Sequence, residues 1–277
     1  MYLRPTDLNE ALAALKAAPL EVLAGGTDFY PARVGQRITA DVLDITSLTA
    51  LRGVRDDPDC WRIGALSTWS DLVAAPLPPV FDGLRAAARE VGGVQIQNAG
   101  TVGGNICNAS PAADGVPALL ALDAEVELSA MDAVRRVPLR DFITGSRRTC
   151  RRPDELVTAV LVPHWGSGAR SLFLKLGARR YLVISIVMVA ACVEAGTDGA
   201  VARATVAVGA CSEVAQRLTK LEAKLLGRPL TPALADLARP DDLAPLMPIS
   251  DVRGSAEYRR DAALTLVRRA LAELGRE

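Results

Sequence analysis

The chain has 277 residues, half of them hydrophobic, and its 32 Lys and Arg side chains balance 32 Asp and Glu side chains. This length allows one large domain or two modest ones. Because no basic surplus exists, the composition argues against a general nucleic-acid binder. The short Arg pairs at 147–148, 151–152 and 179–180 are interpreted as solvated edges or ion-pair partners.

Cysteine and histidine usage restricts the chemistry further. The five cysteines are scattered without a CxxC pair, and the single histidine is His164. The chain is therefore expected to hold neither zinc nor an iron–sulfur cluster, and hydrolase catalysis through His164 has little support. No export signal is visible at the start, and the longest apolar run, residues 181–193, is too short for a membrane helix. A cytoplasmic location is expected.

The first part of the chain alternates helices and strands. Asp7 and Glu10 form a predicted capping box before an Ala- and Leu-rich helix that ends near Pro19. Short apolar strands are predicted at residues 21–24, 41–45, 61–65 and 124–128. Further helices are predicted from residue 68, over 81–91 and at 118–121. The uncharged, Gly- and amide-rich stretch 92–108 is predicted to form loops.

The pattern changes after Pro163, where strands are followed by helices. Strands are predicted at residues 171–176, 182–194 and 202–210, and helices at 219–226 and 256–274. This order is typical of a separate α+β layer, so a domain boundary is predicted near residue 168.

Two Gly-Gly pairs are the most informative local feature. The sequence lacks GxGxxG and GxxxxGK[ST] but contains Ala24-Gly25-Gly26-Thr27-Asp28 after a strand, and later Thr101-Val102-Gly103-Gly104-Asn105. Such loops can present unobstructed backbone N–H groups and Thr hydroxyls to a pyrophosphate. Each pair alone is also compatible with an ordinary turn.

An acidic residue follows the second pair at a suggestive distance. Asp114 lies beyond Asn108-Ala109-Ser110-Pro111-Ala112-Ala113, where a carboxylate can bind a ribityl or ribose hydroxyl. The alternative is that Asp114 caps the following helix, and both roles are compatible.

At these motifs the sequence resembles the FAD-binding (medium) subunit of the xanthine dehydrogenase and carbon monoxide dehydrogenase family. The likeness extends over essentially the whole chain, through Asp141-Phe142-Ile143-Thr144-Gly145, Phe173-Leu174-Lys175-Leu176-Gly177-Ala178-Arg179-Arg180, Leu225-Leu226-Gly227 and the segment 248–260. It implies an α+β fold, in which a two-subdomain FAD-binding part of the vanillyl-alcohol-oxidase type precedes a C-terminal α+β domain with an antiparallel sheet. The expected parts are residues 1–168, with subdomains of about 1–55 and 56–168, and residues 169–277.

The resemblance also implies FAD as the cofactor and a set of contacts to it. The residues that match the family's FAD contacts are Leu23, Ala24, Gly25, Gly26, Thr27, Asp28, Phe29, Ile96, Thr101, Gly103, Gly104, Asn105, Asp114, Val157, Lys175 and Tyr181. Among them, Val157, Ile96 and Tyr181 are expected near the isoalloxazine, and Lys175 near its polar edge. Without the resemblance, Lys175 would be interpreted as a surface lysine. Asp28 replaces a Ser or Glu of some members, and Val91 an aromatic residue.

The implied function is electron relay within a larger assembly. A large molybdopterin subunit and a small subunit with [2Fe–2S] clusters are the expected partners, in a dimer of heterotrimers. Electrons would pass through FAD to NAD, a quinone or oxygen. The segment around Asp251 and Arg259-Arg260, which matches the family, is expected to be structural or to lie at a subunit interface. Two alternatives stay open: a stand-alone flavin oxidase, and a non-enzymatic scaffold that lost FAD.

Overall fold

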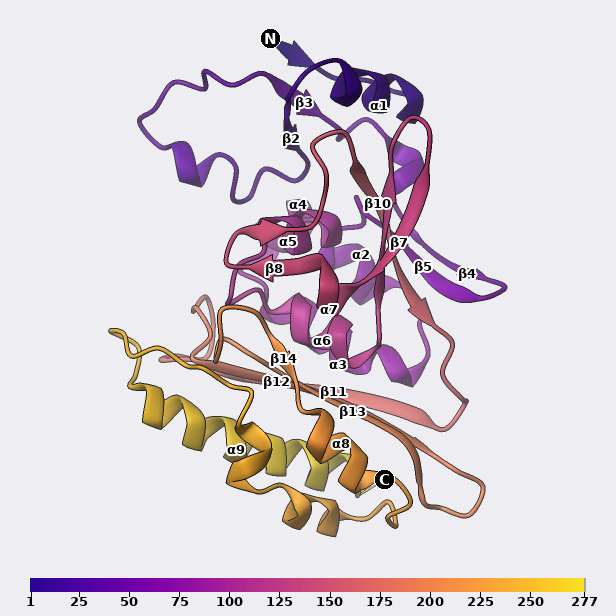
Figure 1. Cartoon of the computed structure of the whole chain (residues 1–277), viewed down its shortest axis with the longest axis vertical. Coiled ribbons are helices and arrows are strands. Elements are labelled where there is room, and N and C mark those ends of the chain that lie inside the picture. The colour runs from indigo at the N-terminus through magenta and orange to yellow at the C-terminus, as the bar shows by residue number, and fades with distance from the viewer. Residues whose placement is uncertain (277) are drawn as a thin grey trace.

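The computed structural model describes residues 1–276, and it stacks three tiers along its long axis (Figure 1). The first tier is a small parallel sheet of order β1-β3-β2. Its elements are β1 (Tyr2–Leu3), α1 (Leu8–Ala17), β2 (Glu21–Leu23), η1 (Pro31–Arg33), β3 (Val42–Asp44) and η2 (Thr49–Leu51). Apolar residues of α1, including Leu12 and Leu15, pack with Leu43 and Ile45 and form the core of this tier.

The middle tier is a five-stranded antiparallel sheet of order β4-β5-β10-β6-β7. Its strands are β4 (Val54–Asp57), β5 (Cys60–Gly64), β6 (Glu125–Ser129), β7 (Val134–Pro138) and β10 (Leu156–Pro163). Its helices are α2 (Trp69–Ala74), η3 (Pro79–Phe81), α3 (Asp82–Glu90), α4 (Val94–Ala99), α5 (Val102–Asn108), α6 (Gly115–Ala121) and α7 (Leu139–Phe142). A short hairpin completes it, with strands β8 (Ile143–Gly145) and β9 (Arg148–Thr149).

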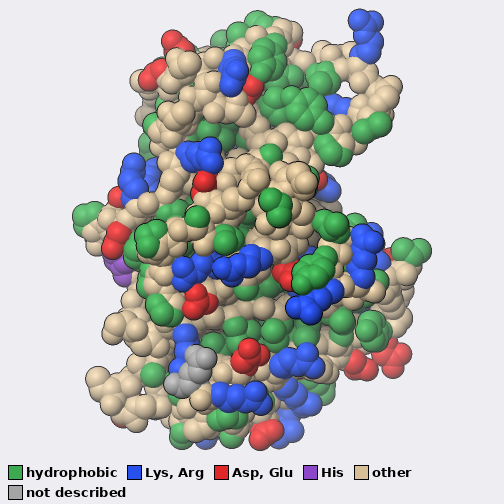
Figure 2. Space-filling model, turned by 180° about the vertical axis from the view of Figure 1, so that it is seen from behind, with side chains coloured by type: hydrophobic (Ala, Val, Ile, Leu, Met, Phe, Trp, Pro, Cys, Tyr) green, Lys and Arg blue, Asp and Glu red, His purple; other side chains and the backbone are tan. Residues whose placement is uncertain are grey.

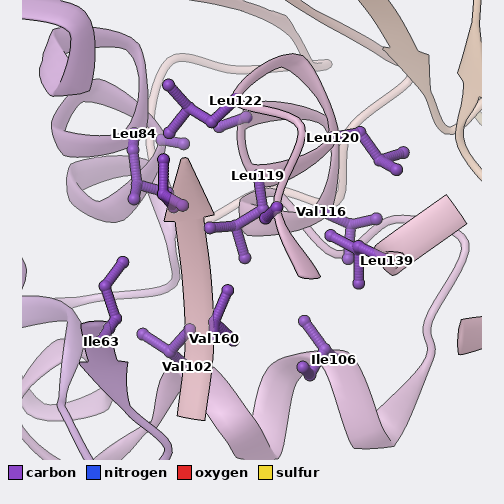
Figure 3. Close-up of a cluster of buried hydrophobic side chains, with 14 of the residues drawn as sticks. Ile63, Leu84, Val102, Ile106, Val116, Leu119, Leu120, Leu122, Leu139 and Val160 are labelled. Carbon is purple, nitrogen blue, oxygen red and sulfur yellow. The ribbon is translucent and has the colours of Figure 1, made fainter. Parts of the chain in front are cut away.

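Side chains from these helices meet over the central strand β10. Figure 3 shows Leu84 of α3, Ile106 of α5 and Leu119 of α6 around Val160. All four are fully buried. The middle tier therefore has one continuous apolar core that holds α3, α5 and α6 against β10.

The third tier is an antiparallel sheet of order β11-β12-β13-β14. Its elements are β11 (Ala169–Leu176), β12 (Val187–Ala195), β13 (Val201–Gly209), β14 (Gln216–Arg217), α8 (Thr219–Leu225), η4 (Pro232–Leu237), η5 (Pro240–Leu243) and α9 (Ala256–Leu274). The long helix α9 covers one face of this sheet, and α3 and α6 cover the other (Figure 1).

Alternate residues of β12 enter two different cores. Met188, Ala190 and Cys192 join the core of the middle tier, whereas Val189 and Ala191 join the core beneath α9. Because successive strand residues point to opposite faces, a strand covered on both sides becomes a continuous apolar run. This double covering explains the apolar stretch seen in the sequence. Among the described residues, no helix is both long and apolar enough to cross a membrane.

The strand prediction for residues 182–194 is wrong at its start. β12 begins only at Val187, and Leu182 has a φ of 52°, which interrupts any extended strand. Asp7 caps α1 as predicted, but its side chain accepts from the N–H of Asn9 rather than forming a reciprocal box with Glu10. Helix α9 spans the predicted residues 256–274.

Residues 92–108 form two short helices, so the prediction of loops was wrong. Thr101 caps α5 by accepting from the N–H of Gly104 at 3.0 Å. Val102 and Ile106 bury the inner face of the same helix. Tertiary burial and a good cap therefore outweigh the poor helix propensity of Gly103 and Gly104.

Arg259 has the structural role expected from the sequence. Its guanidinium is buried, pairs with Asp251 at 2.7 Å, and donates to the carbonyl oxygens of Ile186 and Ala210 at 2.7 and 3.1 Å. The pKa of Asp251 is lowered to about 2, first by the N–H of Arg253 and then by Arg259. These bonds attach the start of α9 to the end of the third-tier sheet where β12 begins and β13 ends.

A second ionic group joins the middle and third tiers. Asp123, just after α6, accepts from Arg217 at 2.6 Å and from Arg203 at 2.5 Å, and Arg217 also pairs with Glu222 at 2.5 Å. Burial alone would raise the pKa of Asp123, but the two guanidinium groups lower it below its ordinary value. On the reverse face, basic and acidic side chains are interspersed rather than gathered into one patch of single sign (Figure 2).

We expect Asp123→Asn to lower the free energy of unfolding by roughly 2 kcal/mol, since it leaves two part-buried guanidinium groups without their shared carboxylate. Asn tolerates the φ of 54° at this position, so the change isolates the charge. Urea denaturation would measure the difference. Asp141→Asn is the matched control, because Asp141 is exposed and meets only Arg140, at 3.6 Å. Equal stability of the two variants would contradict a structural role for the Asp123 group.

Candidate cofactor-binding site

A cavity of about 920 Å³ lies between the first and middle tiers. Its walls come from the loop after β2, from Gly100 to Asn108 around α5, from the β8–β9 hairpin and from Val157 on β10. The two Gly-Gly motifs, far apart in the sequence, therefore face one space. The volume falls within the range of about 300–1,000 Å³ typical of ligand pockets.

The first motif supplies backbone donors that the protein itself leaves free. Within residues 1–276, none of the N–H groups of residues 25–29 donates a hydrogen bond to another group of the chain. Gly26 has a φ of 71°, which turns the backbone at this point. A run of free amides in a turn forms a concave group of dipoles suited to an anion.

Gly25 has a second requirement, which is close packing. A Cβ at this position would lie 1.9 Å from the carbonyl oxygen of Ala99, at the end of α4. No side chain fits there without moving the backbone of either segment. Gly25 thus holds the first-tier loop directly against the middle tier, at the edge of the cavity.

The second motif acts differently from the prediction. The N–H groups of Val102 and Gly103 donate to Ser67 and Ala65 at 2.9 Å each, and that of Gly104 donates to the Thr101 hydroxyl. The exposed amides expected here are therefore already used by the fold. A Cβ on Gly103 would meet Ala65 at 2.8 Å, so this glycine lets α5 approach the end of β5.

Asn105 carries an unsatisfied polar atom at the cavity wall. Its Oδ1 is buried without a hydrogen-bond partner in the described part of the chain, although the residue lines the cavity. Buried acceptors are nearly always satisfied in folded proteins. The atom lies toward the start of α6, 3.1 Å from where a Cβ on Gly115 would stand, so it does not open into the cavity. The cavity size and the free amides together fit a dinucleotide that has a pyrophosphate.

Most of the predicted FAD contacts line this cavity. They are Ala24, Gly25, Gly26, Thr27, Asp28, Phe29, Ile96, Thr101, Gly103, Gly104, Asn105 and Val157. The four others do not line it: Leu23 is buried in the protein, Tyr181 is 63% exposed, and Asp114 and Lys175 contact each other.

Asp114 and Lys175 form a buried ion pair between the middle and third tiers. The Lys175 Nζ donates to Asp114 at 2.8 Å and to the carbonyl oxygen of Glu90 at 3.3 Å, and Ser185 donates to Asp114 at 2.6 Å. The interpretation of Lys175 as a surface lysine was therefore wrong. Asp114 precedes α6, but its side chain makes no capping bond, so that alternative was wrong too.

The electrostatics of Asp114 are dominated by its burial. Burial raises the pKa of its carboxyl above the ordinary value, and Lys175 and Ser185 oppose that shift without cancelling it. Lys175 is connected to the cavity wall through the carbonyl oxygen of Glu90, whose neighbour Val91 lines the cavity.

Two arginines that the sequence analysis treated as solvated or ion-paired line the cavity. These are Arg147 and Arg151, on either side of β9. Their neighbours Arg148 and Arg152 follow the expectation, since they approach Glu213 at 3.2 Å and Glu155 at 4.0 Å. No sequence pattern distinguishes the cavity-lining arginines, 147 and 151, from the ion-paired arginines, 148 and 152. The difference arises from the orientation of the β8–β9 hairpin relative to α5.

Among described residues, no group of His, Cys, Asp and Glu is arranged to hold a metal ion.

Two family models match the chain. Residues 1–165 match "FAD binding domain in molybdopterin dehydrogenase", and residues 173–274 match "CO dehydrogenase flavoprotein C-terminal domain".

Known proteins resemble the chain over nearly its full length. The nicotinate dehydrogenase FAD-subunit of Eubacterium barkeri is 31% identical, with 94% of this chain and 91% of that protein covered. The nicotine 6-hydroxylase medium subunit of Paenarthrobacter nicotinovorans is 29% identical, with 99% and 96% covered.

A solved structure shows the same fold. In a carbon monoxide dehydrogenase from Hydrogenophaga pseudoflava that lacks the Mo-pyranopterin moiety of the molybdenum cofactor, one chain superimposes with a TM-score of 0.87 at 29% identity, covering 99% of this chain and 96% of that one. The predicted fold, a two-subdomain FAD-binding part followed by an α+β domain with an antiparallel sheet, is confirmed. The chain belongs to the FAD-binding family of molybdopterin dehydrogenases, whose members include the medium subunits of carbon monoxide and xanthine dehydrogenases.

Proposed function

We propose that this chain is the FAD-carrying electron-transfer subunit of a molybdenum hydroxylase complex. Its partners are a large molybdopterin subunit and a small [2Fe–2S] subunit, in a dimer of heterotrimers. The support comes from the family match and from relatives whose names describe FAD or medium subunits. The observation that carries the proposal is the loop of free amides at residues 25–29, facing a cavity of dinucleotide size.

In this proposal, different cavity-lining residues contact different parts of FAD. The amides of residues 25–29 bind the pyrophosphate, and Asn105 lines the same cavity. Val157 and Ile96 supply apolar surface for the ring system. Leu23, Asp114, Lys175 and Tyr181 shape or support the site from outside the cavity.

When bound, FAD accepts electrons singly and passes them on in pairs, so the protein's contribution is position and electrostatics. The acceptor is NAD, a quinone or oxygen. No general base is needed for such a relay, which agrees with the single His164: it lies on the surface and bonds to Asp56 at 2.8 Å, outside the cavity lining. A stand-alone oxidase would act without partners, and a scaffold would bind no FAD.

We expect Gly25→Ala to remove FAD from the purified chain, because the added Cβ would overlap the Ala99 carbonyl oxygen and displace the free amides. Visible absorbance and analysis of the released flavin would measure the loss. Gly168→Ala is the control, since a Cβ there meets only one atom, at 3.8 Å. Retention of FAD by a folded Gly25→Ala chain would contradict the assigned site, and absence of FAD from the unaltered chain would contradict the proposed function.

The relay itself is tested in the complex purified with its partners. A Gly25→Ala complex should still show bleaching of its iron–sulfur absorbance when its substrate is added, but reduction of NAD, quinone or oxygen should fall by at least about tenfold. Added FAD should not restore the rate. Unchanged acceptor reduction would show that electrons leave by another route. A wild-type chain that purifies alone and oxidises substrate by itself would favour the oxidase.

Lys175→Met should lower the free energy of unfolding by roughly 3 kcal/mol, because it leaves the Asp114 carboxylate buried without its cation. Removing Lys175 should raise the pKa of Asp114 further. Since a raised folded-state pKa favours the protonated form, the variant should be most stable at low pH and lose stability as pH rises from the ordinary value of 3.8 through that raised pKa.

Urea denaturation across this pH range measures the effect of Lys175→Met. The exposed Lys220→Met serves as control, and Asp114→Asn combined with Lys175→Met should recover much of the stability. If Lys175→Met left stability unchanged but shifted the flavin reduction potential, a contact with the flavin would replace the support role.

A further inference from the structure

Two cationic side chains of the cavity have no anionic partner in the protein. Arg147 and Arg151 both line it, yet neither lies within ion-pair distance of an Asp or Glu among residues 1–276. In the described chain, the part-buried Arg62, Arg135 and Arg217 are paired with carboxylates, whereas Arg170 and Arg268, like Arg151, bond only to carbonyl oxygens. Arg147 and Arg151 differ from Arg170 and Arg268 in lining the cavity, where an anion supplied from outside can reach them.

Both guanidinium groups are held in place by oxygens that carry no net charge. Arg147 Nη1 donates to the carbonyl oxygen of Asn108 at 3.3 Å and to its side chain. Arg151 Nη1 donates to the carbonyl oxygens of Arg152 and Glu155 at 3.1 and 2.7 Å. In each case Nε and Nη2 have no bond to another group of residues 1–276, so donors are left for a ligand.

The other described charged residues that line the cavity, Glu21, Asp28 and Arg33, supply no further unpaired cation. Glu21 and Arg33 form an ion pair with each other and cancel. Asp28 lies in the free-amide loop and adds a negative charge to the lining. A pyrophosphate approaching that loop would be repelled by Asp28 unless cations compensated. The amides of α5 cannot do so, since they are bonded within the protein.

We propose that Arg147 and Arg151 bind the pyrophosphate of FAD, as counter-charges that complete the amide loop of residues 25–29. This inference rests on the proposed function. The planar guanidinium fork matches phosphate oxygens in bidentate geometry, and a two-charge anion matches two arginines. The hairpin β8–β9 is thus a third wall of the cofactor site, beside the two glycine motifs.

The test uses the full-length chain stripped of flavin and titrated with FAD by fluorescence quenching at low and high salt. Arg147→Gln and Arg151→Gln should each weaken FAD binding by roughly tenfold, or about 1.4 kcal/mol. Each should also flatten the dependence of affinity on salt, because one screened charge contact is lost. Arg151→Lys should restore part of both. Arg148→Gln is the matched control, because Arg148 pairs with Glu213 and does not line the cavity.

Riboflavin, which has no phosphate, separates a charge effect from a loosened hairpin. Its binding should be unchanged in Arg147→Gln and Arg151→Gln. Affinity for FAD equal to wild type in both variants would overturn the inference while leaving the proposed function intact. So would equal losses for FAD and riboflavin with an unchanged salt dependence. A wild-type chain that binds no FAD would overturn both.

Discussion

The contact between the backbones of Gly25 and Ala99 is the constraint on which the site depends. A Cβ at residue 25 would lie 1.9 Å from the Ala99 carbonyl oxygen, so the first tier meets the middle tier without any intervening side chain. That approach holds the loop of residues 25–29 over the cavity with its amides unpaired. Because the protein itself does not use these donors, they are available to a ligand in the cavity.

The sequence was sufficient for the parts of the site that depend on local backbone shape. A Gly-Gly pair directly after a strand predicts a tight turn with open amides, and Gly25 and Gly26 form such a turn. The same prediction, a turn with open amides, was wrong at Gly103 and Gly104. There Thr101 supplies a cap and Val102 and Ile106 supply a buried face, neither of which is evident from glycine content. Helix propensity is a weak local preference that such packing overrides.

Charged residues were harder to assign, because their roles depend on partners distant in the sequence. Asp114 meets Lys175 across the junction of two tiers, and Asp123 meets Arg203 and Arg217 across the same junction. Nothing local distinguishes these pairs from solvated charges. Conversely, Arg147 differs from its neighbour Arg148 only in the direction each takes from the hairpin. The family resemblance identified Asp114 and Lys175 as important, whereas the structure shows them bonded to each other.

The chain matches two family models with a break between residues 165 and 173, yet its packing is continuous there. Met188, Ala190 and Cys192 of β12 belong to the same core as α3 and α6, and the next residues along the strand belong to the core under α9. One face of β12 is covered by the middle tier and the other by α9. Separating the third tier from the middle tier would therefore expose apolar surface on β12. The boundary near residue 168 stays a prediction, and in the structure α3 and α6 pack directly on the third-tier sheet. Helix α3 ends at Glu90, whose carbonyl oxygen accepts a hydrogen bond from Lys175 of β11. The next residue, Val91, lines the cavity. The third tier therefore helps to position the wall of a cavity that it does not itself line.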